Sequence, residues 1–242
     1  FFFFFKVRMQ SLPLERTQTQ VQVNAFVRSV YNWMAVGLAL TGFVAYYVST
    51  SEAILRVVFG SPMVLIILVI AQLGLVFSLA ARVHKMEAST ATAVFVVYSA
   101  LNGVTLSSIF LVYARTSIVS VFFVCAATFL ACSVYGWFTR RDLTSMGNFM
   151  FMGLIGIIIA SLANLFFRSS GLQAIISYIG VLVFVGLTAY DTQKIKNMAL
   201  SQPAGLEAGV VRKGAIMGAL SLYLDFINLF IMLLHIFGGS RE

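Results

Sequence analysis

Charged residues are scarce in this sequence of 242 residues: they make up 10% of it, whereas hydrophobic residues make up 60%. A soluble domain has about 25% charged and about 45–50% apolar residues. The mean hydropathy is +0.97. These values exclude a soluble globular protein and indicate an integral membrane protein. The length suits one compact bundle and leaves no room for a sizeable soluble domain.

Cysteine is rare as well, with only Cys125 and Cys132. They stand seven positions apart in one expected helix, which separates them by about 10 Å along its axis. That separation is too long for a disulfide, and two thiols alone do not form a zinc site. We therefore expect both to be small packing residues, and we expect no resident cofactor.

Acidic residues are the scarcest charged type, with eight against sixteen Lys and Arg. Only two of the eight, Asp191 and Asp225, lie within apolar runs long enough to cross a bilayer. A charge there costs about 2.5–3.5 kcal/mol on insertion scales, and such residues usually face a partner or a wet cavity. We expect the rest of the chain to be a scaffold around these two acids.

Long apolar runs dominate the sequence, and each has about 19–24 residues, enough to cross a hydrocarbon core of about 30 Å as a helix. The runs are continuous rather than alternating, which excludes a β-barrel. No internal repeat is evident, so nothing indicates an inverted-repeat transporter. The sequence predicts an all-α bundle of seven transmembrane helices. The expected spans are Val30–Val48, Pro62–Ala81, Ala91–Tyr113, Ile118–Phe138, Gly147–Phe167, Leu172–Thr192 and Gly214–Phe237.

The basic residues, which give a net charge of +8, stand mainly in short connections between these spans. We therefore expect them to set the topology in the lipid bilayer, and we expect no nucleic-acid partner. Alternate sides of the seven spans hold 12 and 4 of the 16 Lys and Arg residues. The positive-inside rule then places the N-terminus in the cytoplasm and the C-terminus outside.

The domain prediction is an N-terminal tail over residues 1–25 and a seven-helix membrane domain over residues 26–242. The first five residues are all Phe. They lack the basic start and the small-residue cleavage site of a signal peptide. We expect residues 1–8 to be an artificial addition before a natural start at Met9.

Two carboxylates in a low-dielectric site cannot both ionise cheaply, so a contacting pair shares a proton and titrates as a unit. Carboxylates also suit calcium, which takes six to eight oxygen ligands. Two carboxylates supply too few oxygens for tight storage, which favours a weak transit site completed by carbonyls and water. The alternative is that each acid is satisfied separately.

Asp191 stands five residues before Lys196, which places it about 7–8 Å inside the cytoplasmic boundary, and Asp225 stands eleven residues after Gly214, about 16 Å inside. A direct contact therefore needs the last helix to begin below the membrane edge or to tilt. Asn228 stands three residues after Asp225 and shares its face, whereas Tyr190 points away from its neighbour Asp191. Tyr223, Asn228 and Tyr190 are candidates to donate to the acids or to line a path.

An enzyme is a further alternative, because intramembrane aspartyl proteases carry one Asp on each of two consecutive helices. Tyr190 and Asp191 match one half of their pattern. The other half is Gly-x-Gly-Asp, whereas Leu222–Asp225 reads LYLD and lacks the glycines that let a substrate strand approach. We therefore expect no catalytic activity.

Three blocks of the sequence resemble the transmembrane Bax inhibitor motif family, the Bax inhibitor-1-like proteins, and within it a Gram-negative bacterial member. The first block is Thr92–Phe95 with Tyr98–Phe110, which includes Asn102 and is similar to the family's central signature. The second, Leu187–Lys196 (LTAYDTQKIK), resembles its sixth helix. The third, Leu220–Phe230 (LSLYLDFINLF), resembles its last helix. The resemblance covers roughly residues 26 to 239.

The resemblance implies a seven-helix bundle with the last helix central and a pH-sensitive calcium leak across a bacterial inner membrane. It implies that Asp191 and Asp225 share a proton and that a basic residue near the end of the second helix latches one of them. Arg82 is the best candidate for this latch, and Lys85 competes. The chain departs from members with an acid in the second helix, because Gln72 is the only strongly polar residue inside that span here.

The family resemblance also keeps an interaction role open. Family members are credited with restraining a membrane protease or another stress-response partner. The loops of this chain contain no evident docking motif, so we treat this as the alternative to a calcium leak.

Overall fold

The computed structural model describes residues 2–203 and 206–239, and for residues 2–20 it describes the backbone alone. The described part is mostly helical and contains no strand, which confirms the predicted all-α fold. Its elements are α1 (Phe2–Thr50), α2 (Glu52–Phe59), α3 (Pro62–Arg82), η1 (Val83–Lys85), α4 (Ala88–Leu106), α5 (Ile109–Val112), α6 (Arg115–Phe138), α7 (Thr144–Phe167), α8 (Ser170–Leu200) and α9 (Ala208–Phe237).

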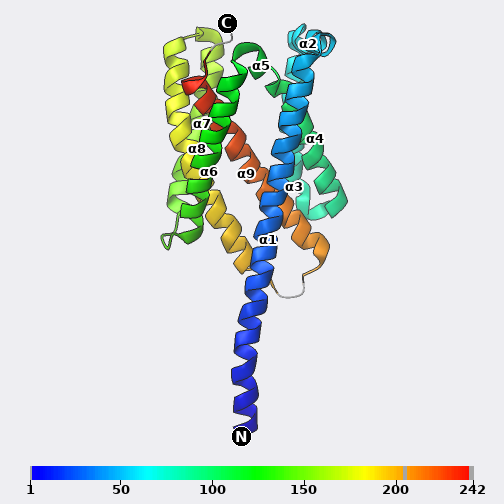
Figure 1. The fold of residues 1–242 in the computed structure, drawn as a ribbon, viewed down its shortest axis with the longest axis vertical. Helices are drawn as coiled ribbons and strands as arrows, with labels where there is room; N and C mark the ends of the chain where they lie inside the picture. Colours follow the sequence, from blue (N-terminus) through cyan, green and yellow to red (C-terminus); the bar gives the residue numbers. More distant parts are fainter. Residues whose placement is uncertain (1, 204–205, 240–242) are drawn as a thin grey trace.

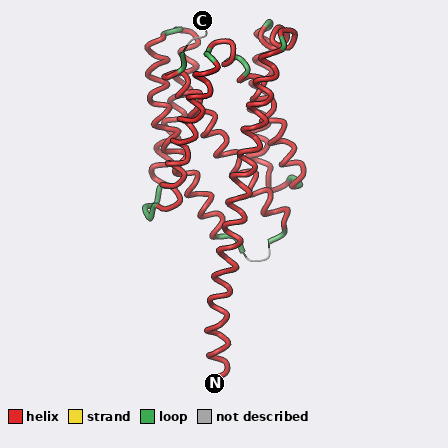
Figure 2. Tube along the Cα trace, in the orientation of Figure 1, coloured by secondary structure: helices red, strands yellow, loops and turns green. Residues whose placement is uncertain are grey.

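Seven stretches of the described chain are long and apolar enough to cross a membrane, as the sequence predicts. The loops are short and gather at the two ends of the bundle (Figure 2). The lower part of α1 and the last turns of α9 lie towards opposite ends of the bundle, as an odd number of crossings requires (Figure 1).

The expected N-terminal tail, residues 1–25, continues the first span in the structure, because α1 begins at Phe2. Val23 is buried against the core. The side chains of residues 1–20 lie outside the described part. The division into a tail and a membrane domain stays a prediction.

The third span is broken near its end, where one continuous segment was expected from the apolar pattern. Ser107 and Ser108 separate α4 from α5, and their hydroxyls donate to Val104 O (2.7 Å) and Thr105 O (3.0 Å). Such side-chain bonds to the helix's own carbonyls compete with the backbone ladder and bend the helix.

Helices α6, α7 and α8 form one side of the bundle and α1, α3 and α4 form the other, while α9 crosses obliquely between them (Figure 1). α9 has 30 residues, which is about 45 Å of helix. That exceeds a core of about 30 Å, and the helix runs obliquely to its neighbours (Figure 1). It packs against α1, α4, α6 and α8. A central position for this helix stays a prediction.

Close backbone approach holds these helices together at two glycines. A side chain at Gly136 of α6 would overlap the backbone carbonyl of Ala189 on α8. A Cβ on Gly103 of α4 would lie 2.7 Å from Thr41 O on α1. Without a hydrophobic drive between helices in lipid, such small residues let helices pack by close contact. The apolar faces of α3 and α7 are largely exposed and face the lipid.

Candidate functional site

The two membrane aspartates are close enough to interact electrostatically, although no hydrogen bond joins them within the described part of the chain. Asp191 lies about 14 Å from the end of α8, and Asp225 lies about 26 Å along α9 from its start. The oblique course of α9 offsets this difference in depth. A Cβ on Gly218 would lie 3.2 Å from Ile195, so the two helices touch one turn from Asp191 and two turns from Asp225.

Asp225 is buried, with 5% of its surface exposed. Its Oδ2 is a buried oxygen that has no hydrogen-bond partner within the described part of the chain. The nearby Asp191 interacts with it electrostatically. Buried polar groups in proteins are almost always paired. An orphaned carboxylate oxygen inside a membrane span is therefore an energetically costly feature.

Asp191 is partly exposed and lines a small pocket of about 70 Å³ with Gly218 and Ser221. Met198 and Met217 line this pocket and also a larger cavity of about 440 Å³. The larger cavity lies among the ends of α3, α8 and α9. The structure thus places Asp191 between the cavity at this end of the bundle and the buried Asp225.

The buried hydroxyl of Tyr223 joins α9 to α1 and α4. Asn102 Nδ2 donates to Tyr223 Oη at 2.8 Å, and Thr41 Oγ1 lies 2.7 Å from the same oxygen. Thr41 donates its own proton to Ser99 O at 2.8 Å, so Tyr223 is the donor to Thr41. The ring of Tyr223 packs edge-on against Phe95. The hydroxyl groups of Tyr223 and Thr41 and the amide nitrogen of Asn102 therefore all have hydrogen-bond partners.

An aromatic cluster covers the α6–α9 interface beyond Asp225. The ring of Phe226 lies 5.4 Å from that of Phe129 and 5.6 Å from that of Phe122. Phe122 also contacts Phe230 at 6.3 Å. On the same side, α1, α5, α6 and α9 enclose an apolar cavity of about 310 Å³. The part of α9 that directly follows Asp225 is therefore packed among apolar and aromatic side chains.

The other polar candidates from the sequence bind elsewhere. Asn228 Nδ2 donates to Leu224 O of its own helix at 2.8 Å. Tyr190 packs its ring over Gly147 of α7, as expected from its position beside Asp191. Gln72 Nε2 donates to Leu101 O at 2.9 Å and so joins α3 to α4. The structure brings Tyr223 and Asn102 together but connects neither to the aspartates by a hydrogen bond.

The two latch candidates, Arg82 and Lys85, are exposed at the end of α3 and in η1. Within the described residues neither forms an ion pair, so the latch stays a prediction. Two basic residues of α9, for which the sequence predicts a role in topology, form hydrogen bonds to other helices at this end of the bundle. Arg212 donates to Thr92 Oγ1 at 3.1 Å, and Lys213 donates to His84 O at 3.2 Å.

Several of these residues could not be singled out from the sequence. Thr41 and Ser99 are single small polar residues in apolar runs, a pattern that occurs in most membrane helices. Arg212 also lies over the ring of Trp33 at 5.5 Å. The one available signal was that Arg212 and Lys213 directly precede the apolar run that contains Asp225.

Comparison with known proteins shows the family to which this chain belongs. The model of the family described as "Inhibitor of apoptosis-promoting Bax1" (Bax1-I) matches residues 23–242. The chain belongs to the Bax1-I family. The resemblance of its three sequence blocks to Bax inhibitor-1-like proteins is thereby confirmed.

Relatives within the Bax1-I family cover nearly the whole chain. The "Inner membrane protein YbhL" of Escherichia coli (strain K12) is 52% identical over 93% of this chain and 95% of its own length. An uncharacterized protein of Borreliella burgdorferi is 45% identical over 97% of this chain and 100% of its own length. A protein of Rickettsia prowazekii is 46% identical over 90% of both chains.

Proposed function

We propose that this chain is a pH-sensitive calcium leak channel, gated by a proton shared between Asp191 and Asp225. The observation that carries the proposal is the buried, unpartnered carboxylate oxygen of Asp225 next to a second carboxyl group. A structural role alone does not account for it, because an apolar residue would fit the site at lower cost. An ionisable residue inside a membrane span is by default a candidate functional site.

Calcium fits this arrangement as a passing ion. It prefers carboxylate, carbonyl and water oxygens. Asp191 lines a pocket that adjoins the larger cavity at this end of the bundle, so a hydrated cation has a route to one carboxylate. The aromatic cluster beyond Asp225 represents a closed state, and conduction requires the helices to separate there.

Protonation provides the switch. Two neighbouring carboxylates in a low-dielectric site repel one another when both are ionised, so the pair binds a proton whose loss changes the charge between α8 and α9. When both carboxylates are ionised, their repulsion weakens the contact between α8 and α9. Flux that depends on pH near neutrality is the expected consequence.

The proposed location is a bacterial inner membrane, supported by the printed name of the Escherichia coli relative. We propose the predicted orientation with it, the N-terminus in the cytoplasm and the C-terminus outside. We also propose that the chain is not an enzyme, because Asp225 is 5% exposed and Leu222–Asp225 lacks the glycines that let a substrate strand approach.

The test is calcium flux into liposomes that contain the purified protein, measured across a range of pH. Asp191→Asn and Asp225→Asn should each flatten the pH dependence and reduce the flux. Glu52→Gln is the control, because Glu52 is an exposed acid that pairs only with Arg56 at the surface (2.6 Å). If both Asn variants keep the wild-type pH profile, the proposal is wrong.

The alternative is a regulatory protein that restrains a membrane protease. It predicts that purified protein alone conducts no calcium and that a protease co-purifies from solubilised membranes. A wild-type protein without flux in liposomes, together with such a complex, would support this alternative over the channel.

A further inference from the structure

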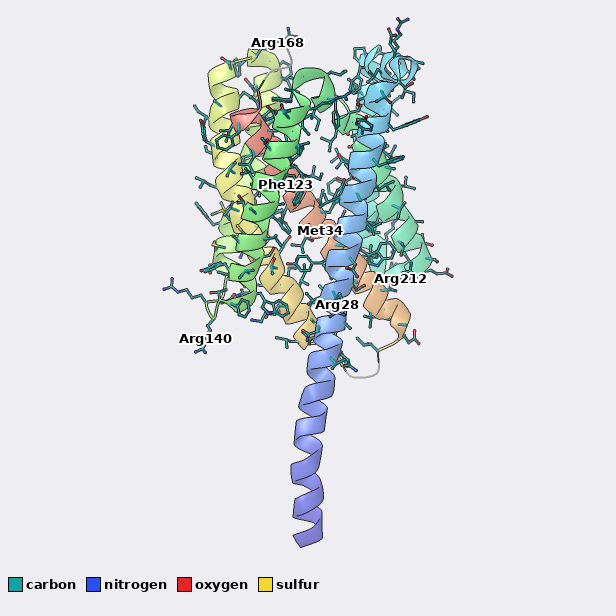
Figure 3. All side chains as sticks on the ribbon, viewed as in Figure 1. Arg28, Met34, Phe123, Arg140, Arg168 and Arg212 are labelled. Carbon is teal, nitrogen blue, oxygen red and sulfur yellow. The ribbon has the colours of Figure 1, made fainter. Side chains whose placement is uncertain are left out.

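A basic hollow lies at the same end of the bundle as the cavity near Asp191, between the α6–α7 loop and the end of α8. Its volume is about 560 Å³, and its lining includes three cationic side chains, Arg140, Arg141 and Lys196, and one acid, Asp142. Figure 3 shows Arg140 at the end of the bundle that holds Arg28 and Arg212, opposite Arg168.

The positive charges of this hollow are not neutralised by the protein. Within the described residues, the side chains of Arg140 and Arg141 form no ion pair. Asp142 is directed at α7 instead: its Oδ1 accepts the hydroxyl (2.6 Å) and the amide (2.9 Å) of Thr144. These bonds lower the pKa of Asp142 and keep it ionised. The lining thus has three positive charges against one negative charge.

The loop that carries the two arginines is fixed rather than free. The side chain of Gln193 on α8 is buried, accepts Leu143 N at 2.8 Å and donates to Arg141 O at 2.8 Å. Lys196 donates to Trp137 O at 2.5 Å and lies 5.7 Å from the centre of that ring. One donor of its three is used there, which leaves two for a ligand. The backbone of this loop and the Lys196 side chain are therefore held in place at the hollow before a ligand binds.

The surroundings of the hollow indicate a lipid rather than a soluble anion. It lies where α6 and α8, both long and apolar enough to span a membrane, end. Lipid headgroups are expected at the ends of such spans. Phe138 and Leu200 line it with 74% and 54% of their surfaces exposed. A phosphate group in the hollow would place its acyl chains along these apolar side chains. Basic pockets between membrane helices bind anionic headgroups in this way.

We propose that this hollow binds the phosphate of an anionic phospholipid, with Arg140, Arg141 and Lys196 as its ligands. The bound lipid links the α6–α7 loop to the segment of α8 that follows Asp191. The site does not depend on the proposed calcium leak, because it uses none of the residues assigned to that path.

The test measures the binding of phosphatidylglycerol and of phosphatidylcholine to detergent-purified protein by native mass spectrometry. The double variant Arg140→Gln/Arg141→Gln should lower the affinity for phosphatidylglycerol about 25-fold, since each basic residue near an anionic surface contributes roughly fivefold. The charge-matched control is Arg28→Gln/Arg168→Gln, two exposed arginines outside the hollow, and should bind as wild type does. Asp142→Asn removes the one negative charge and should strengthen binding.

Three results would overturn the proposal. The first is phosphatidylglycerol binding that is unchanged in the Arg140→Gln/Arg141→Gln variant. The second is an equal loss in the Arg28→Gln/Arg168→Gln control, which would indicate a diffuse effect of surface charge. The third is a rise in melting temperature with inorganic phosphate alone that equals the rise with phosphatidylglycerol, which would assign the site to free phosphate. Asp142→Asn makes the hollow more positive, so it tests the same electrostatic contribution by an expected gain of binding. Its result does not depend on whether the arginine double variant folds.

Discussion

Replacing Asp225 by Leu should make this protein more stable and at the same time inactive. The side chain is 5% exposed, and its Oδ2 has no hydrogen-bond partner among the described residues. A buried polar group left unpaired costs about 1–3 kcal/mol. Leucine has a similar size and adds no polar atom. We therefore expect Asp225→Leu to raise the free energy of unfolding by about 1–3 kcal/mol.

The matched control is Asp225→Asn, which keeps a polar side chain of the same shape in the same place. It removes the charge but retains an oxygen and adds two donors that find no acceptor at the orphaned position. We expect no comparable gain in stability from it. The difference in stability between the Leu and Asn variants gives the cost of burying a polar group. The difference between the Asn variant and the wild type gives the cost of burying a charge.

Two measurements check this prediction. Unfolding by a denaturing detergent in mixed micelles gives the free energy of unfolding, and calcium flux in liposomes gives the activity. A loss of more than about 1 kcal/mol in Asp225→Leu would show that the carboxyl group has a partner that supports the fold. If Asp225→Leu is stabilised and keeps the wild-type calcium flux, Asp225 is not part of the ion path. Either result would refute the reasoning.

Four further predictions concern other parts of the bundle. Tyr223→Phe should destabilise the protein by about 1 kcal/mol, since hydrogen bonds between membrane helices average about 0.6 kcal/mol and Asn102 loses its acceptor. The double variant Tyr223→Phe/Asn102→Ala should lose less unfolding free energy than the sum of the two single variants. Gly136→Ala should cost about 1–3 kcal/mol by overpacking α6 against α8, seen as a lower melting temperature. As the latch, Arg82 would hold an ionised aspartate by a charge-assisted bond of about 1.5–3 kcal/mol. Arg82→Ala should therefore increase calcium leakage at neutral pH about ten- to a hundredfold. If only Lys85→Ala increases the leakage, the latch is Lys85. A C-terminal reporter that is active only in the cytoplasm should stay silent, and a strong signal would contradict the predicted orientation.

The class of fold and the pair of acids could be predicted from the sequence alone. Seven apolar runs determine seven spans because each backbone polar group in lipid must bond within its own helix. Asp191 and Asp225 stand out for the same physical reason: a charge in such a run is costly and therefore rare. These properties depend on local composition and need no knowledge of which helices touch.

The contacts between helices were decided only by the tertiary structure. The α8 and α9 helices extend past their apolar runs, and the tilt of α9 brings Asp225 near Asp191 despite their different depths. The hydrogen bonds of Tyr223 to Asn102 and Thr41 join residues far apart in the chain. Thr41 offered no sequence signal, because a single threonine in an apolar run can equally bond to its own helix. Which partner it finds depends on how closely Gly103 lets α1 and α4 approach.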